Sequence, residues 1–266
     1  MHILLFSLAY EPDQSSNSYV LTPLVKALAN VGHQVTVLTA MPHRGEDEIY
    51  EPYRGKLWSL EKQPNLDIIR LWIYVPKSSE SRIEAALRWL SFNIPVTLAS
   101  LLTKSHDLVF ALSPPFTLGL TAWLVGLVKG VPFLYNVQDV YPDVYLQRGT
   151  LKEGFLASLM RRVSMFIYRR AAQITVLTEG FRQNLITKGV DEEKVEVIPN
   201  FVDTNLFQPA PRENAFSKEY GLDEKFVVMY AGNVGDSLGI ETVFRAAQVL
   251  HSETDILFVI GGRGAA

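Results

Sequence analysis

The feature that most constrains this chain is a series of short, uninterrupted apolar runs that alternate with longer amphipathic stretches. The runs are rich in Val, Ile and Leu, and polar turn residues bound each of them. Strands that are apolar on both faces belong to a sheet that helices cover on two sides. The alternation predicts a doubly wound, Rossmann-like α/β fold with a parallel sheet. The predicted strands are 2–8, 34–39, 67–75, 107–112, 133–137, 173–178 and 194–198, and the predicted helices are 18–31, 82–103, 116–128, 151–171 and 179–188.

A segment rich in turn formers follows the last of these strands. Periodicity is lost between Pro199 and Pro211, and then a fresh strand (226–231), helix (240–251) and strand (255–260) begin. These final stretches span roughly 40 residues, a size that rarely buries enough surface to be stable alone. We therefore expect an N-terminal domain over 1–198, a linker over 199–225 and the start of a second domain over 226–266. We also expect that second domain to continue past the last residue or to pack on the first domain.

Composition excludes several classes of protein. The 25 basic and 28 acidic residues give a net charge of −3, which argues against nucleic acid as a partner. The chain has no cysteine, so disulfides and thiolate metal sites are excluded. Its five histidines lack the spacing of metal ligands, and a catalytic metal is not indicated.

Two apolar segments invite a membrane interpretation. The N-terminal run has no basic residue before it, so it reads as a buried first strand rather than as a signal peptide. Residues 108–128 carry no charge and are long enough for a membrane span. Ser113, Pro114 and Pro115 interrupt this segment, and a Pro-Pro pair disfavours one continuous helix. A strand, a turn and a helix are the preferred interpretation, with a spanning helix as the alternative.

Polar residues follow two of the predicted strands. Ser16 and Asn17 lie in a loop without glycine, so the loop lacks the sequence fingerprint of a dinucleotide-binding site. Either these two residues line a cleft on the acceptor side, or they merely cap the next helix. Gln138 and Asp139 follow strand 133–137, and ligands of open α/β sheets bind at such strand ends. Asp139 can meet an acceptor hydroxyl as a base or hydrogen-bond acceptor, and Gln138 can donate to a sugar or phosphate oxygen. The alternative is that Asp139 and Asp143 cap the next turn.

Glycines gather after two strands of the second domain. Gly232, Gly235 and Gly239 lie in a strand-to-helix loop, where bare backbone N–H groups and a helix N-terminus suit a diphosphate. Gly262 and Arg263 follow the next strand. Either they line a second side of the phosphate or nucleotide site, or they belong to a frayed chain end.

The predicted helix 151–171 is basic on one side. Met160, Val163, Ile167 and Ala171 form a stripe that faces the core. Four arginines project elsewhere, and with an exposed Met165, Phe166 or Tyr168 they could hold the helix on an anionic membrane, to which the helix around Trp89-Leu90-Ser91-Phe92 could add apolar contact. A solvated charged face is the alternative. The arginines are Arg161, Arg162, Arg169 and Arg170.

Four stretches, taken in order, resemble the retaining glycosyltransferase family 4 with the GT-B architecture, and within it bacterial polysaccharide transferases of the colanic-acid and N-acetylfucosamine type. The third and fourth are quite specific as an ordered pair. The stretches are Ser113-Pro114-Pro115-Phe116, Val137-Gln138-Asp139-Val140-Tyr141-Pro142-Asp143, Val197-Ile198-Pro199-Asn200-Phe201-Val202-Asp203, and Tyr230-Ala231-Gly232-Asn233-Val234-Gly235 running into Gly239-Ile240-Glu241-Thr242-Val243.

The resemblance implies a role for several residues. Gly232, Asn233 and Gly235 match the loop under the donor diphosphate, Asn200 lies at the domain crossover near the donor, and Asp139 matches a polar acceptor-side position. Such enzymes transfer a sugar with retention and without an obligatory metal. Two basic residues common in the family's donor loop are here Asn233 and Leu238, and the family's acidic pair would lie beyond this sequence.

The expected function is therefore transfer of a sugar from a UDP- or GDP-linked donor to a glycan or lipid-linked acceptor in cell-surface polysaccharide synthesis. No bound cofactor is expected. We expect a cytoplasmic protein that associates with the anionic inner face of the membrane, and a 266-residue chain that is a fragment with weak or no activity. The alternatives are a two-domain nucleotide-sugar epimerase and a non-catalytic glycan-binding or assembly module.

Overall fold

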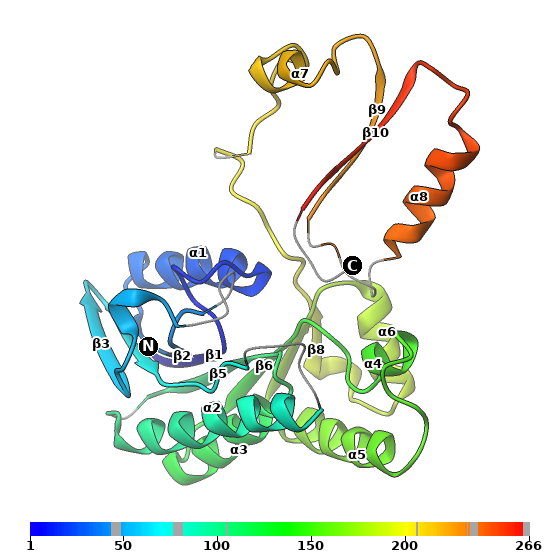
Figure 1. Ribbon diagram of the computed structural model, residues 1–266. Coiled ribbons are helices and arrows are strands. Elements are labelled where there is room, and N and C mark those ends of the chain that lie inside the picture. The colour runs from blue at the N-terminus through cyan, green and yellow to red at the C-terminus, as the bar shows by residue number, and fades with distance from the viewer. Residues whose placement is uncertain are drawn as a thin grey trace. The chain divides into compact units, whose positions relative to one another are not determined.

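The structure is a computed structural model that describes residues 1–43, 49–76, 82–104, 106–205, 207–232, 234 and 239–262. The chain divides into two compact units, Met1–Val202 and Asp203–Ala266 (Figure 1). Among the described residues, no helix combines the length and the apolar character that crossing a bilayer requires.

The first unit is built on an eight-stranded sheet in the order β3-β4-β2-β1-β5-β6-β7-β8. Every neighbouring pair is parallel except β3 and β4. The predicted α/β class is confirmed, and the apolar run at 108–128 is a strand and a helix rather than one long helix. The strands are β1 (His2–Ser7), β2 (Gln34–Ala40), β3 (Trp58–Gln63), β4 (Leu66–Leu71), β5 (Leu108–Leu112), β6 (Phe133–Val137), β7 (Gln173–Val176) and β8 (Val195–Val197).

Helices cover the sheet on both faces (Figure 1). One face carries α1, and the other carries α2, α3 and α5. Successive side chains of β1 point to opposite faces, so Leu5 packs in the core under α1 while Leu4 and Phe6 pack in the other core. This double burial explains why the strands read as uninterrupted apolar runs. The helices are α1 (Ser16–Asn30), α2 (Arg82–Leu102), α3 (Leu118–Lys129), α4 (Asp143–Gln147), α5 (Phe155–Arg170) and α6 (Glu179–Thr187), with 3-10 turns at Glu51–Tyr53 and Glu192–Lys194.

Helix α5 packs closely on α3 and on the sheet. A Cβ added at Gly119 would lie well inside van der Waals contact with Ile167 and 3.1 Å from the Tyr135 ring. The expected core stripe of α5 is present, because Met160 and Ile167 are buried. Tyr168, one of the three side chains named as candidates for exposure, is buried: the residue is 2% exposed, and its ring centroid lies 6.1 Å from that of Tyr135. Tyr168 comes directly after buried Ile167 in α5, and its side chain lies on the side of the helix that faces the sheet.

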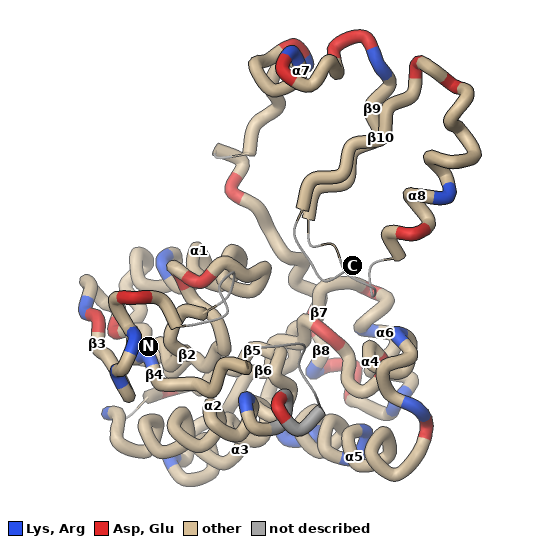
Figure 2. Tube along the Cα trace, viewed as in Figure 1, with Lys and Arg blue, Asp and Glu red and all other residues tan. Residues whose placement is uncertain are grey.

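Strand β3 is one of the elements that the sequence did not predict, together with short helices such as α4. β3 pairs antiparallel with β4 at the sheet edge, and in the turn that joins the two strands Asn65 adopts a φ of 58°. Both signs of charge lie along it (Figure 2), which is typical of an edge strand. Buried Arg70 of β4 holds it in place by donating to both carboxylate oxygens of Glu61, at 2.5 and 3.1 Å. An edge strand with one solvated face lacks the apolar run that marked the other strands.

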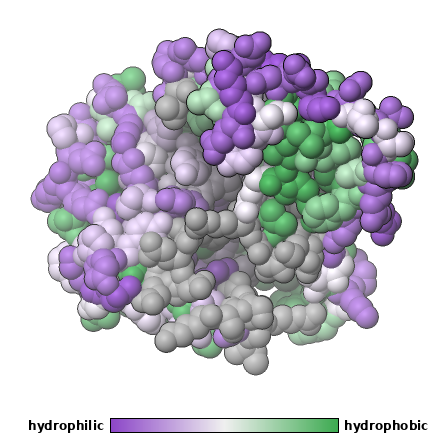
Figure 3. All heavy atoms as spheres, turned by 45° about the horizontal axis from the view of Figure 1, so that its top comes forward, coloured by the Kyte–Doolittle hydropathy of each residue, from purple (hydrophilic) through white to green (hydrophobic). Residues whose placement is uncertain are grey.

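The second unit holds a two-stranded parallel sheet of β9 (Phe226–Ala231) and β10 (Ile256–Gly261), joined through α8 (Ile240–Val249). The short helix α7 (Ala215–Glu219) precedes them within the predicted linker segment, and Asn214 and Ser217 form its capping box. Large apolar side chains of this unit, such as Phe226 and Met229, are exposed. Figure 3 shows a group of hydrophobic residues at the surface of the molecule.

Candidate functional site

The carboxyl ends of the parallel strands meet at one edge of the first unit's sheet, and polar side chains gather there. Asn136, in β6, donates through its Nδ2 to the Thr175 hydroxyl of β7 at 2.8 Å. Gln138, just past β6, donates from its Nε2 to the Asn136 Oδ1 at 2.6 Å. Its backbone N–H donates to the buried Ser113 hydroxyl, which follows β5, at 3.2 Å. Three neighbouring strands therefore contribute to one hydrogen-bonded cluster.

Asn200 joins this cluster from the segment that follows β8. Its Nδ2 donates to the Gln138 Oε1 at 2.9 Å, and the Gln138 Nε2 donates to the Asn200 Oδ1 at 3.3 Å. The structure thus brings together two residues that the sequence analysis selected for separate reasons. Ser113 and Thr175 were missed as members. Ser113 directly follows a predicted strand, and that position was the available signal, whereas Thr175 lies inside the predicted strand 173–178 and only the earlier end of β7, at Val176, puts it near the edge.

Asp139 lies half-buried next to Gln138. Burial raises the pKa of its carboxyl, and the positive charge of Arg148 opposes that change. A raised pKa makes a carboxylate a better proton acceptor, which is the property a base needs. Asp143, the other carboxylate of this stretch, has a different role, because it accepts hydrogen bonds from Asn184 and Lys188 of the α6 region. The first turn of α4 is thereby tied to α6, and of these two carboxylates Asp139 is the one beside the polar cluster.

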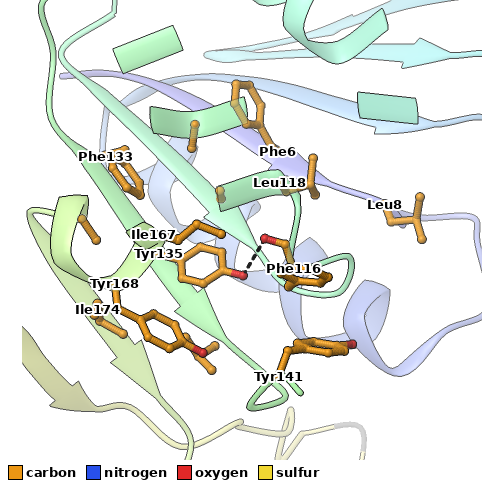
Figure 4. Packing of buried hydrophobic residues seen from close by; sticks show 14 of the residues in the cluster. Phe6, Leu8, Phe116, Leu118, Phe133, Tyr135, Tyr141, Ile167, Tyr168 and Ile174 are labelled. Atoms are coloured by element: carbon orange, nitrogen blue, oxygen red, sulfur yellow. Dashed lines mark hydrogen bonds between the residues drawn. The ribbon is translucent and has the colours of Figure 1, made fainter. Parts of the chain in front are cut away.

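Aromatic packing fixes the turn that carries Asp139. Tyr141 stacks on Phe116 with ring centroids 5.2 Å apart and meets Tyr145 edge-on at 5.2 Å. The Tyr135 hydroxyl donates to the Phe116 carbonyl at 3.1 Å, which anchors the loop after β5 (Figure 4). Burial raises the pKa of Tyr141, so its hydroxyl stays protonated at neutral pH. Two loops of the candidate site are therefore held on one aromatic cluster.

Ser16 and Asn17 open α1 at the same edge, beyond β1. Ser15 is the N-cap of this helix and accepts from the Ser18 N–H, at 3.2 Å. Ser16 is exposed and Asn17 is half-buried. Capping thus falls to Ser15, and the two residues that the sequence analysis named stand in the first helical turn.

A buried acid and imidazole stand near this loop and were not selected from the sequence. Asp13 follows β1 and His43 follows β2, and the His43 Nδ1 lies 3.8 Å from the Asp13 Oδ2 and 2.9 Å from the Met41 carbonyl oxygen. Neither lies in a recognisable motif, so only the parallel pairing of β1 with β2 brings them together.

In the second unit, β9 and β10 end side by side. The Gly232 N–H donates to the Gly261 carbonyl at 2.9 Å, so this amide is already bonded and is not the bare donor that the sequence suggested. A Cβ at Gly262 would collide with the Gly232 carbonyl oxygen and lie 3.0 Å from a Val234 methyl, so the close approach of the two strand ends requires glycine there. Asn233, Gly235 and Arg263 lie outside the described residues.

No group of three or more His, Cys, Asp or Glu side chains in the described parts of the chain is arranged to hold a metal ion.

Residues 18–200 match the model of the glycosyl transferase 4-like domain. The chain is 25% identical to WcaI of Escherichia coli K12, named a colanic acid biosynthesis glycosyl transferase, over 99% of its own length and 66% of that protein. It is 29% identical to the Pseudomonas aeruginosa glycosyltransferase WbjE, over 70% of its length and 48% of the relative. It is 34% identical to the alpha-galactosylglucosyldiacylglycerol synthase of Streptococcus pneumoniae, over 41% of its length and 30% of that protein. The chain spans about two thirds, a half and a third of these relatives.

Solved structures share the fold at low sequence identity. The Arabidopsis thaliana starch synthase IV catalytic domain, bound to ADP and acarbose, matches the whole chain with a TM-score of 0.67 at 14% identity, and the chain covers 69% of it. Anabaena HepE in complex with UDP and glucose matches 99% of the chain with a TM-score of 0.64 at 14% identity, and the chain covers 61% of it. These likenesses confirm the GT-B class of fold. Because the family model covers most of the sequence, the chain belongs to the glycosyl transferase 4-like family.

Proposed function

We propose that the chain supplies the acceptor side and the beginning of the donor side of a retaining glycosyltransferase. In this proposal the enzyme transfers a sugar from a UDP- or GDP-linked donor to a glycan or lipid-linked acceptor in cell-surface polysaccharide or glycolipid synthesis. The names of WcaI and the S. pneumoniae synthase support this class of product. The nucleotides in the titles of the HepE and starch synthase structures support a nucleotide-sugar donor.

The observation that carries the proposal is the polar cluster at the carboxyl edge of the sheet with Asp139 beside it. Ligands of open α/β sheets bind at this edge. The Asp139 carboxylate accepts a hydrogen bond from the acceptor hydroxyl, and its raised pKa favours taking the proton as the hydroxyl attacks the sugar. The amides of Gln138 and Asn200, already fixed by each other, present donors and acceptors to sugar oxygens without first having to become ordered.

On the donor side, the leaving diphosphate gains negative charge as the glycosidic bond to it breaks. Oriented N–H groups lower the barrier because they are fixed before the reaction. The Gly232 N–H is bonded to β10, so we assign this role to the amides that follow it and to the N-terminus of α8, which begins after Gly239. Gly232 and Gly262 then shape the loop rather than each donating a bond.

We further propose that turnover requires a chain longer than the 266 residues. The relatives WcaI and WbjE are longer than this sequence, and the exposed apolar residues of β9 resemble a sheet face that more chain would cover. The segment 199–225 is then the linker between acceptor and donor halves. We also propose that the enzyme works at the cytoplasmic face of the membrane, where the arginines of α5 meet anionic lipid.

Nucleotide binding by the chain tests the donor half. Titration with UDP, GDP and ADP, followed through backbone amide NMR signals, is expected to shift the signals of Ile240–Thr242 with weak affinity. If none of the three nucleotides shifts any signal of the second unit, the donor assignment fails. A non-catalytic glycan-binding module is expected to give that negative result.

Transfer by a longer chain that includes this sequence tests the acceptor half. Asp139→Asn is expected to lower the transfer rate by about 100-fold or more, whereas Asp67→Asn, a half-buried aspartate of β4, leaves it unchanged. An equal effect of both variants would remove Asp139 from the mechanism. A donor that is converted with no acceptor present would instead indicate an epimerase.

A further inference from the structure

Helix α2 carries an aliphatic stripe on its exposed side. The stripe residues recur at intervals of three and four, so they share one helical face. Their side chains are exposed by 40% to 59%, and Leu102 at the end of the helix is 89% exposed. Single exposed leucines are ordinary, but a row of them along one helix marks an interaction surface. The stripe comprises Leu87, Leu90, Ile94, Leu98 and Leu101.

The stripe continues onto α3. Asn93 of α2 donates to the Thr117 hydroxyl at 3.0 Å, and the Lys129 ammonium at the end of α3 donates to the Thr103 carbonyl at 3.0 Å. These bonds fix both ends of α3 against α2. Leu124 and Leu127 of α3 are 40% and 66% exposed. The sequence from 89 to 103 contains no charged residue, so no charge interrupts the stripe between Leu90 and Leu101 (Figure 2).

Basic side chains border this surface on α5. A hollow of about 390 Å³ is lined by Trp123 and Leu127 of α3 together with Arg170. A second, of about 630 Å³, is lined by Arg162, Phe166, Arg169 and Arg170 among others. The Phe166 ring meets Trp123 edge-on at 4.8 Å, and the Arg170 guanidinium lies 5.5 Å from the centre of the Phe166 ring. Each hollow thus joins an apolar wall to a guanidinium, which fits a phosphate group that carries a hydrocarbon chain.

The charges on these three helices are almost all of one sign. Glu84 is the one acidic residue in α2, α3 and α5, against seven basic residues in the same three helices. A second copy of the chain that used this face symmetrically would bring like charges together. An anionic bilayer has the opposite charge and an apolar interior, and it complements both halves of the surface.

We propose that the α2–α3–α5 face is the surface by which the protein lies on an anionic lipid bilayer. The stripe of α2 enters the boundary between headgroups and acyl chains, and the α5 arginines bind lipid phosphates. The inference deepens the membrane association proposed above, because it assigns the apolar contact to the exposed stripe of α2 and to Leu124 and Leu127 of α3.

Co-sedimentation with vesicles tests this surface without any sugar donor, so its outcome is independent of transferase activity. The chain is expected to sediment with vesicles of 3:1 phosphatidylcholine and phosphatidylglycerol and not with phosphatidylcholine alone. The triple variant L90S/I94S/L98S is expected to lower partitioning at least tenfold, and R162Q/R169Q/R170Q is expected to do the same. The control L57S/L60S, which changes exposed leucines beside and within β3, is expected to partition like the parent chain.

Thermal unfolding followed by circular dichroism verifies that each variant is folded. We expect the leucine and isoleucine substitutions to be tolerated, because all of these side chains are exposed. Absence of parent binding to anionic vesicles would overturn the proposal. Unchanged binding of the stripe variant would overturn the role of α2 and leave the arginines as a general anion surface. A concentration-dependent dimer that the stripe variant abolishes, with no vesicle binding, would assign the face to a second copy.

Discussion

The side-chain amides of Gln138 and Asn200 bond to each other in both directions, at 2.9 and 3.3 Å. Gln138 follows β6, and Asn200 follows β8 some 62 residues later. The pair therefore joins the loop that carries Asp139 to the last segment of the first unit. A reciprocal amide pair fixes both side-chain orientations, because turning either amide over would set like groups against each other.

A double-mutant cycle measures this pair. Gln138→Ala and Asn200→Ala are each expected to lower the free energy of unfolding by about 1 kcal/mol, with a coupling energy of ~0.5 to 1 kcal/mol, because the pair is partly exposed. Urea denaturation gives these values, and Gln147→Ala, an exposed position at the end of α4, serves as the control. Strict additivity of the two single changes would show that the bonds do not form in solution.

The close approach of the two strand ends in the second unit predicts a sharp difference between adjacent glycines. Gly262→Ala is expected to destabilise the β9–β10 pair by about 1 to 3 kcal/mol, because its Cβ meets the Gly232 carbonyl oxygen. Gly261→Ala places its Cβ in open space and is expected to be nearly neutral. Amide hydrogen exchange of β9 and β10 separates the two variants. Equal protection in both would mean that the strand ends lie further apart.

The packing of α3 on α5 predicts a similar contrast in the first unit. Gly119→Ala is expected to lower the free energy of unfolding by about 1 to 3 kcal/mol, since Ile167 and Tyr135 occupy the space. Gly180→Ala in α6 makes an ordinary 3.7 Å contact with the Thr178 hydroxyl and is expected to be neutral or to stabilise by up to ~1 kcal/mol. Thermal or urea unfolding compares them. Similar stability of the two variants would contradict the close α3–α5 packing.

Buried His106, just before β5, predicts a loss of stability in mild acid. Burial lowers its pKa to about 4 from the ordinary 6.5, and the charges of Lys129 and His2 add to this. Below pH 6.5 the unfolded chain binds a proton that the folded chain does not, so stability is present above that pH and falls as the pH decreases toward 4. The expected loss is about 2 kcal/mol between pH 6.5 and 5.

Urea denaturation across this pH range measures the loss attributable to His106. His106→Gln is expected to flatten the profile, whereas His251→Gln, at an exposed position, leaves it unchanged. A profile that keeps its slope in His106→Gln would assign the acid sensitivity to other groups.

Most of the elements could be predicted because their causes are local. Apolar runs marked the strands that helices bury on both faces, and Gly32, Gly130 and Gly189 marked three helix ends, where their φ angles are indeed positive. Strand β3 escaped prediction because its cause is not local: Arg70, buried in β4, pairs with Glu61 across the hairpin. Tyr168 was misplaced because an arginine-rich sequence does not show which side of the helix meets the sheet.

The same distinction between local and non-local causes applies to the candidate site. The sequence by itself determined the α/β class, the family motifs and the polar residues that follow strands, since these depend on side-chain chemistry and short periodicity. Tertiary structure decided that Gln138 bonds to Asn200, that Asp139 is half-buried beside them, and that the Gly232 amide is used by β10. Such contacts depend on strand order and register, which join residues distant in sequence, and no local pattern encodes that order.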